Sequence, residues 1–174
     1  LTPTAFVNAM ESVQEDYPRP AFDALLNLVD SHDGARILWT LTPGADNEEA
    51  KSDPAARAAG VRDLAMVAAI QLSFPGMASI YYGTEVGLTG HDDPDDRRPY
   101  PWDDQDEQIR ALYRTYARAR AEHPALATGD LRFLVADDAR GTLAYLRRAP
   151  DDAAVTAVNT GAADVELRIP TGDG

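Results

Sequence analysis

The residues best suited to chemistry in this sequence lie in two clusters, LVDSHDGAR at residues 28–36 and FPGMASIYYGTEVGLTGHDDPDDRRPYPW at residues 74–102. Both clusters combine carboxylates with arginine, and the second adds tyrosine and tryptophan. Carboxylate and guanidinium groups make charge-assisted hydrogen bonds, and aromatic faces pack against apolar ring faces. The two clusters therefore predict binding of a polar, ring-shaped ligand such as a sugar.

The first cluster contains the consecutive residues Ser31, His32 and Asp33. A nucleophile triad needs serine, histidine and aspartate side chains that converge from separate segments, so this tripeptide does not predict one. Arg36 follows Asp33 by three residues, a spacing at which a turn can bring the two side chains together. The spacing therefore allows a contact between Arg36 and Asp33.

Two carboxylates, Asp33 and Glu85, are candidates for the acid and base of glycoside cleavage, because that reaction typically uses two carboxyl groups. For Glu85 there is an alternative, in which its carboxylate accepts hydrogen bonds from the backbone amides that follow Gly83. The sequence favours this second role for Glu85.

The acidic run at residues 92–96 could attract a divalent cation, since carboxylates are hard ligands. Arg97 and Arg98 offer these acids internal partners instead, so we expect no metal here and a hydrogen-bonding rim suited to hydroxyl groups. Of two adjacent tyrosines in this cluster, one is expected to point into the core. The aromatic residues available to sugar rings are Tyr81, Tyr82, Tyr100 and Trp102.

The composition limits the classes of partner. A formal charge of -13 repels nucleic acid phosphates and anionic lipids, so neither nucleic acid nor a membrane is expected as a partner. The absence of cysteine excludes a thiolate nucleophile and sulfur-based metal sites. With 44% hydrophobic and 26% charged residues, the composition is that of a globular domain without a membrane-spanning run.

Periodicity and turn residues predict the elements that must position the two clusters. Thr4 is expected to cap the first helix, and Asp53 is expected to cap a later helix that begins with Pro54. The segment between residues 42 and 53 is expected to be a loop. The predicted helices cover residues 4–16, 54–73 and 104–122, and the predicted strands cover residues 24–29, 78–82, 131–135, 142–148, 154–159 and 165–169.

This order predicts an α/β fold in which helices alternate with two buried parallel strands, followed by a separate antiparallel module. The boundary falls near Gly129. Parallel strands that end in polar loops place those loops on one face, where α/β enzymes build their sites. Both clusters follow a predicted strand, so we expect them to meet on that face.

The clusters resemble motifs of the α-amylase superfamily (glycoside hydrolase family 13), most closely its neopullulanase, cyclomaltodextrinase and maltogenic amylase group. LVDSHDGAR resembles the motif at the end of barrel strand seven, and FPGMASIYYGTEVG resembles the strand-eight motif GxPxIYYGxExG. Ala78 stands where proline is common in that motif. DPDDRRPYPW resembles the continuation DPxxRxPxxW.

The resemblance implies that residues 1–128 are the last quarter of a (β/α)8 TIM barrel, comprising strands 7 and 8 with flanking helices. Residues 129–174 would be the start of an antiparallel β-sandwich domain. A (β/α)8 barrel takes about 250 residues, so barrel strands one to six would lie outside this chain. The family's nucleophilic aspartate and general-acid glutamate belong to those strands, and we expect this C-terminal fragment to be inactive by itself.

The resemblance also implies roles for individual residues. Asp33 would be the third catalytic carboxylate, which stabilises the transition state, and His32 would bind the same sugar. Asp93 and Arg97 would bind the next sugar towards the non-reducing end. Supporting positions would be Arg36, Tyr82, Glu85 and Trp102.

For the parent protein, the resemblance implies a retaining hydrolase of α-1,4-glucosidic bonds in cyclodextrins, pullulan or maltodextrins. Its partner would be an α-glucan oligosaccharide or a cyclodextrin, with no cofactor. Calcium is compatible with the full-length enzyme but is not indicated here, and a homodimer is compatible with the group. The location of the protein is left open, with the cytoplasm favoured by the resemblance.

Two other interpretations stand beside this one. The first is a non-catalytic amylase homologue that holds maltodextrin or a partner protein through the same rim. The second is a biological subunit that another chain completes. We favour the second least, because cut barrel edges would leave strand hydrogen bonds and apolar surface unpaired.

Overall fold

The computed structural model describes residues 2–169. The chain divides into two compact units, one formed by residues 1–26, 72–77 and 119–174 and the other by residues 27–71 and 78–118. Within residues 2–169, every helix is too short or too polar to reach across a bilayer. The first cluster and most of the second belong to the second unit.

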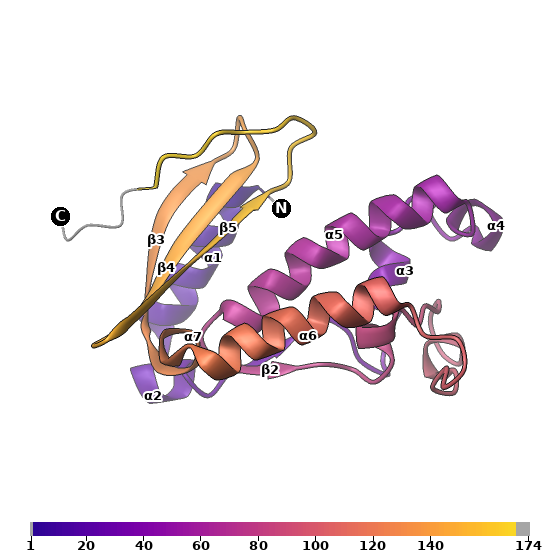
Figure 1. The fold of residues 1–174 in the computed structure, drawn as a ribbon, viewed down its shortest axis with the longest axis horizontal. Coiled ribbons are helices and arrows are strands. Elements are labelled where there is room, and N and C mark those ends of the chain that lie inside the picture. Colours follow the sequence, from indigo (N-terminus) through magenta and orange to yellow (C-terminus); the bar gives the residue numbers. More distant parts are fainter. Residues whose placement is uncertain (1, 170–174) are drawn as a thin grey trace. The chain divides into compact units, whose positions relative to one another are not determined.

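The first unit contains a three-stranded antiparallel sheet, drawn in orange and yellow in Figure 1. The central strand β4 (Thr142–Ala149) pairs with β3 (Asp130–Asp137) on one side and with β5 (Asp152–Asn159) on the other. These three strands confirm three of the four predicted for the C-terminal part. The helices of this unit are α1 (Pro3–Asp16), α2 (Arg19–Phe22) and α7 (Pro124–Thr128).

Aromatic rings form the core of the first unit. Phe74 lies edge-on to Tyr145 and to Phe6, with ring centroids 5.6 Å and 5.9 Å apart. Tyr145 is fully buried, and its hydroxyl lies 2.6 Å from Ser73 Oγ, which satisfies the polar end of the ring. The core therefore joins the sheet to residues 72–77 of the same unit.

Arg147 is a buried cation that binds backbone carbonyls. Its Nη1 donates to the carbonyl of Ser73 at 2.6 Å, and its Nη2 donates to that of Gly129 at 2.9 Å. Burial lowers the pKa of Arg147 to about 10, and the neighbouring charge of Arg120 lowers it as well. Arg120 Nη1 donates to the carbonyls of Leu72 and Leu126, so two arginines supply donors to the ends of helices, where carbonyls lack partners within the helix.

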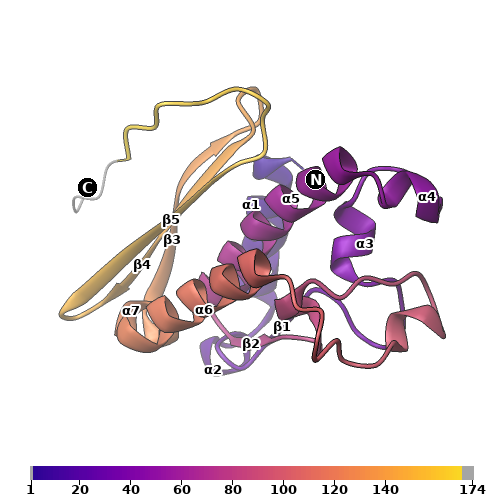
Figure 2. The ribbon, with the colours of Figure 1, turned by 45° about the vertical axis from the view of Figure 1, so that its right-hand side comes forward.

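The second unit carries the loops that follow the two short strands β1 (Leu26–Leu28) and β2 (Met77–Ser79), which pair in a two-stranded sheet. The long helices α5 (Pro54–Ser73) and α6 (Glu107–Glu122) run side by side in Figure 1 and Figure 2, and both belong mostly to this unit. Its shorter elements are α3 (Ile37–Leu41), α4 (Glu48–Lys51) and the 3₁₀ turns η1 (Thr84–Val86) and η2 (Asp95–Arg97).

The helix predictions are largely confirmed. Asp53 caps α5 as predicted, because its Oδ1 accepts from the backbone amides of Ala55 at 2.9 Å and Ala56 at 3.0 Å. The cap of α1 is Thr2 rather than Thr4, since Thr2 Oγ1 accepts from the amide of Ala5 at 3.2 Å. The predicted loop at residues 42–53 contains the short helix α4.

Two strand predictions are wrong. Residues 165–169 form no strand. The sheet consists of β3, β4 and β5, and within the described residues no strand pairs with residues 165–169. The predicted strands at residues 24–29 and 78–82 were expected to be buried, yet the exposed fraction is 52% for Leu28 and 40% for Tyr82. A sheet of two three-residue strands has too few neighbours to cover apolar side chains on both faces.

The predicted boundary near Gly129 lies one residue before β3 begins. The first unit takes in that sheet together with α1 and α2. The assignment of residues 1–128 to a barrel and of residues 129–174 to a β-sandwich stays a prediction.

Candidate functional site

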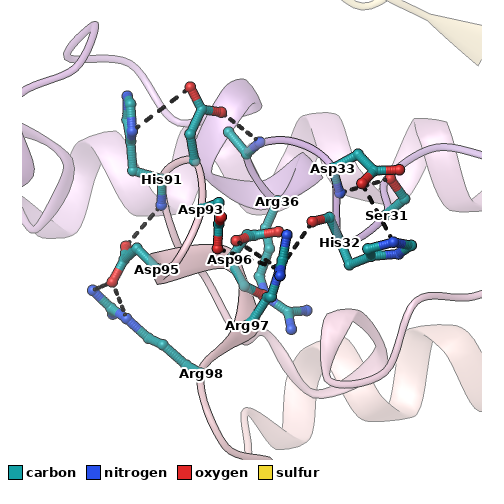
Figure 3. Close-up of polar contacts among 12 residues, drawn as sticks. Ser31, His32, Asp33, Arg36, His91, Asp93, Asp95, Asp96, Arg97 and Arg98 are labelled. Carbon is teal, nitrogen blue, oxygen red and sulfur yellow. Dashed lines mark hydrogen bonds and ion pairs between the residues drawn. The ribbon is translucent and has the colours of Figure 1, made fainter.

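The loop that follows β1 presents His32 and Asp33 to solvent (Figure 3). Their side chains are 65% and 75% exposed, and His32 Nε2 lies 3.3 Å from Asp33 Oδ1. The amide of Asp33 donates to Ser31 Oγ at 3.1 Å, which turns the backbone back on itself. The carboxylate of Asp33 is therefore free to receive hydroxyl groups on its open side.

Arg97 joins the second cluster to the first. Its Nε donates to the backbone carbonyl of His32 at 3.1 Å and lies 3.4 Å from Asp93 Oδ1. Arg97 belongs to η2, 65 residues beyond His32 in the chain. Figure 3 shows Arg97 between the acidic loop and the loop of His32 and Asp33. The structure thus brings together the four residues His32, Asp33, Asp93 and Arg97, as the two predicted clusters required.

The contact between Arg36 and Asp33 that their spacing allows is not formed, because Arg36 is buried whereas the side chain of Asp33 is exposed. The Arg36 guanidinium is fully buried, where its Nε donates to the carbonyl of Asp96 at 2.8 Å and its Nη1 to that of Tyr82 at 2.7 Å. Its backbone amide donates to the carbonyl of Gly90 at 3.0 Å. A buried guanidinium needs several acceptors, and the loops of the second cluster supply two, while Arg36 Nη2 is buried without a hydrogen-bond partner among the described residues. Arg36 therefore connects the first cluster to the second through buried hydrogen bonds.

The adjacent tyrosines both contact Arg36. The guanidinium carbon of Arg36 lies 4.4 Å from the ring centroid of Tyr81 and 4.8 Å from that of Tyr82. Strand alternation predicts that one of the two rings points into the core. Tyr81 is half-buried and Tyr82 is 40% exposed, so neither ring does. The reason is that β2 ends at Ser79 and the tyrosines follow it. Tyr82 Oη donates to the carbonyl of Arg98 at 2.9 Å.

Glu85 lies in η1, and its carboxylate is turned inward. Its Oε2 is buried without a hydrogen-bond partner among the described residues. Burial and the Glu85 carboxylate raise the pKa of Tyr100, to which Glu85 is hydrogen-bonded. Glu85 is therefore poorly placed to be the partner of Asp33 in acid and base catalysis.

Tyr100 connects Glu85 to an exposed aromatic platform. Its ring centroid lies 4.6 Å from that of Trp102, with the planes inclined by 50°. Trp102 is 78% exposed, the largest exposed fraction of any large apolar side chain in the described chain. An indole held this way offers a face to the apolar side of a ring-shaped ligand.

The acidic run makes hydrogen bonds within the loops. Asp95 Oδ1 accepts from Arg98 Nε at 2.6 Å, and Asp92 Oδ1 accepts from the amide of Ala35 at 2.9 Å. Between residues 2 and 169, no three or more carboxylate, histidine or cysteine side chains are grouped so that they could hold a metal ion. The run therefore acts as a scaffold for Asp93 and Arg97.

Two buried residues of the site were not predicted from the sequence. Asp30 is 7% exposed and Thr84 is 1% exposed, and Thr84 Oγ1 donates to Asp30 Oδ2 at 2.7 Å. The only signal in the sequence was a carboxylate directly after an apolar run, which is also typical of a surface residue. Their contact spans 54 residues of chain.

No protein-family model matches the chain. The chain is 36% identical over 169 residues to an amylopullulanase of Thermoanaerobacterium thermosulfurigenes. The aligned region covers 92% of this chain and 9% of that protein. It is 35% identical over 158 residues to a cyclomaltodextrinase of a Bacillus species, covering 90% of this chain and 25% of that protein. Among solved structures, the debranching enzyme from Nostoc punctiforme superposes with a TM-score of 0.81 at 27% identity, covering 98% of this chain and 32% of that one.

The chain spans between 9% and 25% of the length of these two curated relatives. The names amylopullulanase and cyclomaltodextrinase agree with the resemblance of the two clusters. The similarity extends over nine-tenths of this chain, well beyond the motifs themselves. The chain therefore belongs to the α-amylase superfamily (glycoside hydrolase family 13), in the group of neopullulanases, cyclomaltodextrinases and maltogenic amylases.

Proposed function

We propose that this chain is part of a retaining glycoside hydrolase that cleaves α-1,4-glucosidic bonds in cyclodextrins, pullulan or maltodextrins. The observation that carries the proposal is the contact of Arg97 Nε with the His32 carbonyl at 3.1 Å and with Asp93 at 3.4 Å. This contact gathers exposed donors and acceptors from two distant motifs around one space, as recognition of a sugar requires.

In this proposal, Asp33 stabilises the positive charge that develops on the sugar ring in the transition state. His32 donates to a hydroxyl of the same sugar, while Asp93 and Arg97 grip the next sugar. Trp102, packed on Tyr100, offers a face to a further ring. The support comes from Arg36, Tyr82 and Glu85, which lie behind the rim.

The proposed place of the chain in the parent is the last quarter of a (β/α)8 barrel, with β1 and β2 as strands seven and eight. The β3-β4-β5 sheet would begin a β-sandwich. The nucleophile and the general acid would come from other parts of the parent, so the chain by itself would hydrolyse nothing. A cytoplasmic parent that acts as a homodimer is consistent with this assignment.

The test is Asp33→Asn in the full-length protein that contains this chain, with β-cyclodextrin and maltotriose as substrates. We expect turnover to fall by about 10²- to 10³-fold, the usual cost of removing one group that stabilises transition-state charge. Asp103→Asn, at another exposed aspartate of the same unit, is the matched control and should leave turnover unchanged. Turnover of Asp33→Asn within a factor of three of the unaltered protein would contradict the proposal.

Calorimetry with maltotriose separates the enzyme from a non-catalytic homologue. Binding by the unaltered protein without release of glucose or maltose would favour a maltodextrin-binding protein that uses the same rim. Binding accompanied by hydrolysis supports the enzyme.

A further inference from the structure

One carboxylate oxygen closes the loop that carries His32 and Asp33. Asp30 Oδ2 accepts from Thr84 Oγ1 at 2.7 Å and from the backbone amide of Ile37 at 3.2 Å. Ile37 is the first residue of α3, so this contact joins the two ends of the segment between β1 and α3. Thr84 belongs to η1 of the second cluster and is almost fully buried, so its hydroxyl is held in place by the surrounding residues.

The far end of the same segment is held by Arg36. Its Nε and Nη1 donate to the carbonyls of Asp96 and Tyr82, and its amide donates to the carbonyl of Gly90. Asp30 and Arg36 are thus buried anchors on either side of exposed His32 and Asp33. A loop fixed at both ends leaves its tip few conformations, which lowers the entropy lost when the tip meets a ligand.

Burying the carboxylate of Asp30 lowers the stability of the folded protein. Its Oδ1 is buried without a hydrogen-bond partner among the described residues, as are Glu85 Oε2 and Tyr113 Oη. Burial raises the pKa of Asp30, and the nearby Glu85 carboxylate adds to this, whereas Thr84, Ile37 and Arg36 lower it. An apolar side chain would avoid that desolvation penalty but could not accept from Thr84 or Ile37. A residue that costs stability and still closes the loop indicates a role in the site.

We infer that Asp30 and Thr84 are positioning residues, which hold the loop of His32 and Asp33 in the geometry that the transition state requires. The inference rests on the proposed function for its catalytic consequence. Its structural part, the fixing of the loop, stands on the hydrogen bonds alone.

The first experiment is Thr84→Val in the full-length protein, an isosteric change that removes only the hydroxyl donor. We expect kcat to fall by about 10- to 100-fold with KM within a factor of three, because a small displacement of a catalytic group has this cost. Asp30→Ala should lower kcat at least as much, whereas Asp30→Asn keeps an acceptor oxygen and should restore kcat to within about threefold. Combining Asp30→Ala with Thr84→Val should cost little more than Asp30→Ala alone.

The matched control is Thr142→Val in β4. Thr142 is as deeply buried as Thr84, but its Oγ1 has no hydrogen-bond partner among the described residues. We expect this variant to keep kcat and KM. An equal fall of kcat in both threonine variants, or unchanged kcat in Thr84→Val, would overturn the inference.

Hydrogen exchange of the backbone amides of residues 31–36 tests the structural part without any activity. We expect exchange there to be at least about tenfold faster in Thr84→Val and Asp30→Ala, and unchanged in Asp30→Asn and Thr142→Val. Unchanged exchange in Thr84→Val would overturn the inference even if the protein hydrolyses cyclodextrin. A protein that hydrolyses nothing, yet shows the expected exchange, would overturn the proposed function and support the positioning role.

Discussion

His32 and Asp33 are held in place by their backbone and by their buried neighbours, while their own side chains stay exposed. The His32 carbonyl accepts from Arg97, and the Asp33 amide donates to Ser31 Oγ. The exposed side chains therefore keep their hydrogen-bonding capacity for a ligand. Under the proposed function, the exposed groups would meet the ligand, while the buried groups fix the backbone.

Trp102 tests the exposed side of this division. We expect Trp102→Ala to weaken binding of maltotriose by about 3- to 10-fold, since aromatic packing contributes ~0.5–1.5 kcal/mol beyond area burial. Its stability should change little, because the ring is 78% exposed. Isothermal titration calorimetry and thermal unfolding measure the two quantities. Tyr17→Ala, at an exposed aromatic residue of the first unit, should leave binding unchanged, and an equal loss in both variants would refute the role of Trp102.

Asp30 tests the buried side through the pH dependence of stability. Burial raises its pKa in the folded protein above the ordinary value of 3.8. The folded state therefore holds a proton that the unfolded state releases, so the contribution of Asp30 to stability is largest below 3.8 and is lost as pH rises through the folded pKa. Asp30→Asn cannot titrate, so its free energy of unfolding relative to the unaltered protein should increase between about pH 3.5 and pH 7.

Asp152 supplies a control of opposite sign. Hydrogen bonds from the amide of Ala125 and from His123 lower its pKa below 3.8. Its contribution to stability is present above 3.8 and is lost as pH falls, so Asp152→Asn should be relatively more destabilising at neutral pH. Urea unfolding of both variants across this range gives the two slopes. Slopes of the same sign would show that the charge environment of Asp30 has been misassigned.

Among the elements, α5 shows how a cap fixes the start of a long helix. Asp53 Oδ1 accepts from two amides of its first turn, and Pro54 occupies the first helical position. Asp53→Ala should lower the free energy of unfolding by about 1 kcal/mol, whereas Asp53→Ser keeps a capping oxygen and should cost only a few tenths. Denaturant unfolding measures the difference. Equal losses for alanine and serine would mean that the cap contributes nothing specific.

Elements that depend on local signals were predictable from the sequence. The cap at Asp53 and the strands at residues 142–148 and 154–159 depend on short stretches of chain, and the structure confirms them. The strand expected at residues 165–169 failed because a strand needs a partner, and β-propensity does not say whether one is present. The helix α4 was missed because three of its four residues are charged and the segment has no apolar stripe.

For the site, the sequence predicted which clusters meet but not how they meet. The spacing of Arg36 and Asp33 suggested a local contact, whereas the acceptors of Arg36 lie 46 and 60 residues away. Asp30 and Thr84 were missed for the same reason, since burial over long separations leaves no local pattern. The membership of the family was readable, because the motifs keep both residue types and spacing.

At the scale of the whole molecule, two distant stretches of chain build one site, and each contributes both exposed and buried members. The first cluster supplies His32 and Asp33 together with the anchors Asp30 and Arg36. The second supplies the carbonyls and the hydroxyl that hold those anchors. Each cluster depends on hydrogen bonds from the other to keep its geometry. The effects of substitutions in the two clusters should therefore be coupled.

The apolar side chains left bare on β1 and β2 have a consequence for handling the chain in isolation. Leu28 and Met77 are more than half exposed on strands that each pair on one side only within the described residues. Such edges template pairing between molecules, so this stretch produced alone should self-associate. Light scattering should show large particles that shrink in Leu28→Lys/Met77→Lys, because charge on an edge opposes pairing. Tyr17→Lys, at an exposed apolar residue that follows α1 and lies outside both sheets, should leave particle size unchanged.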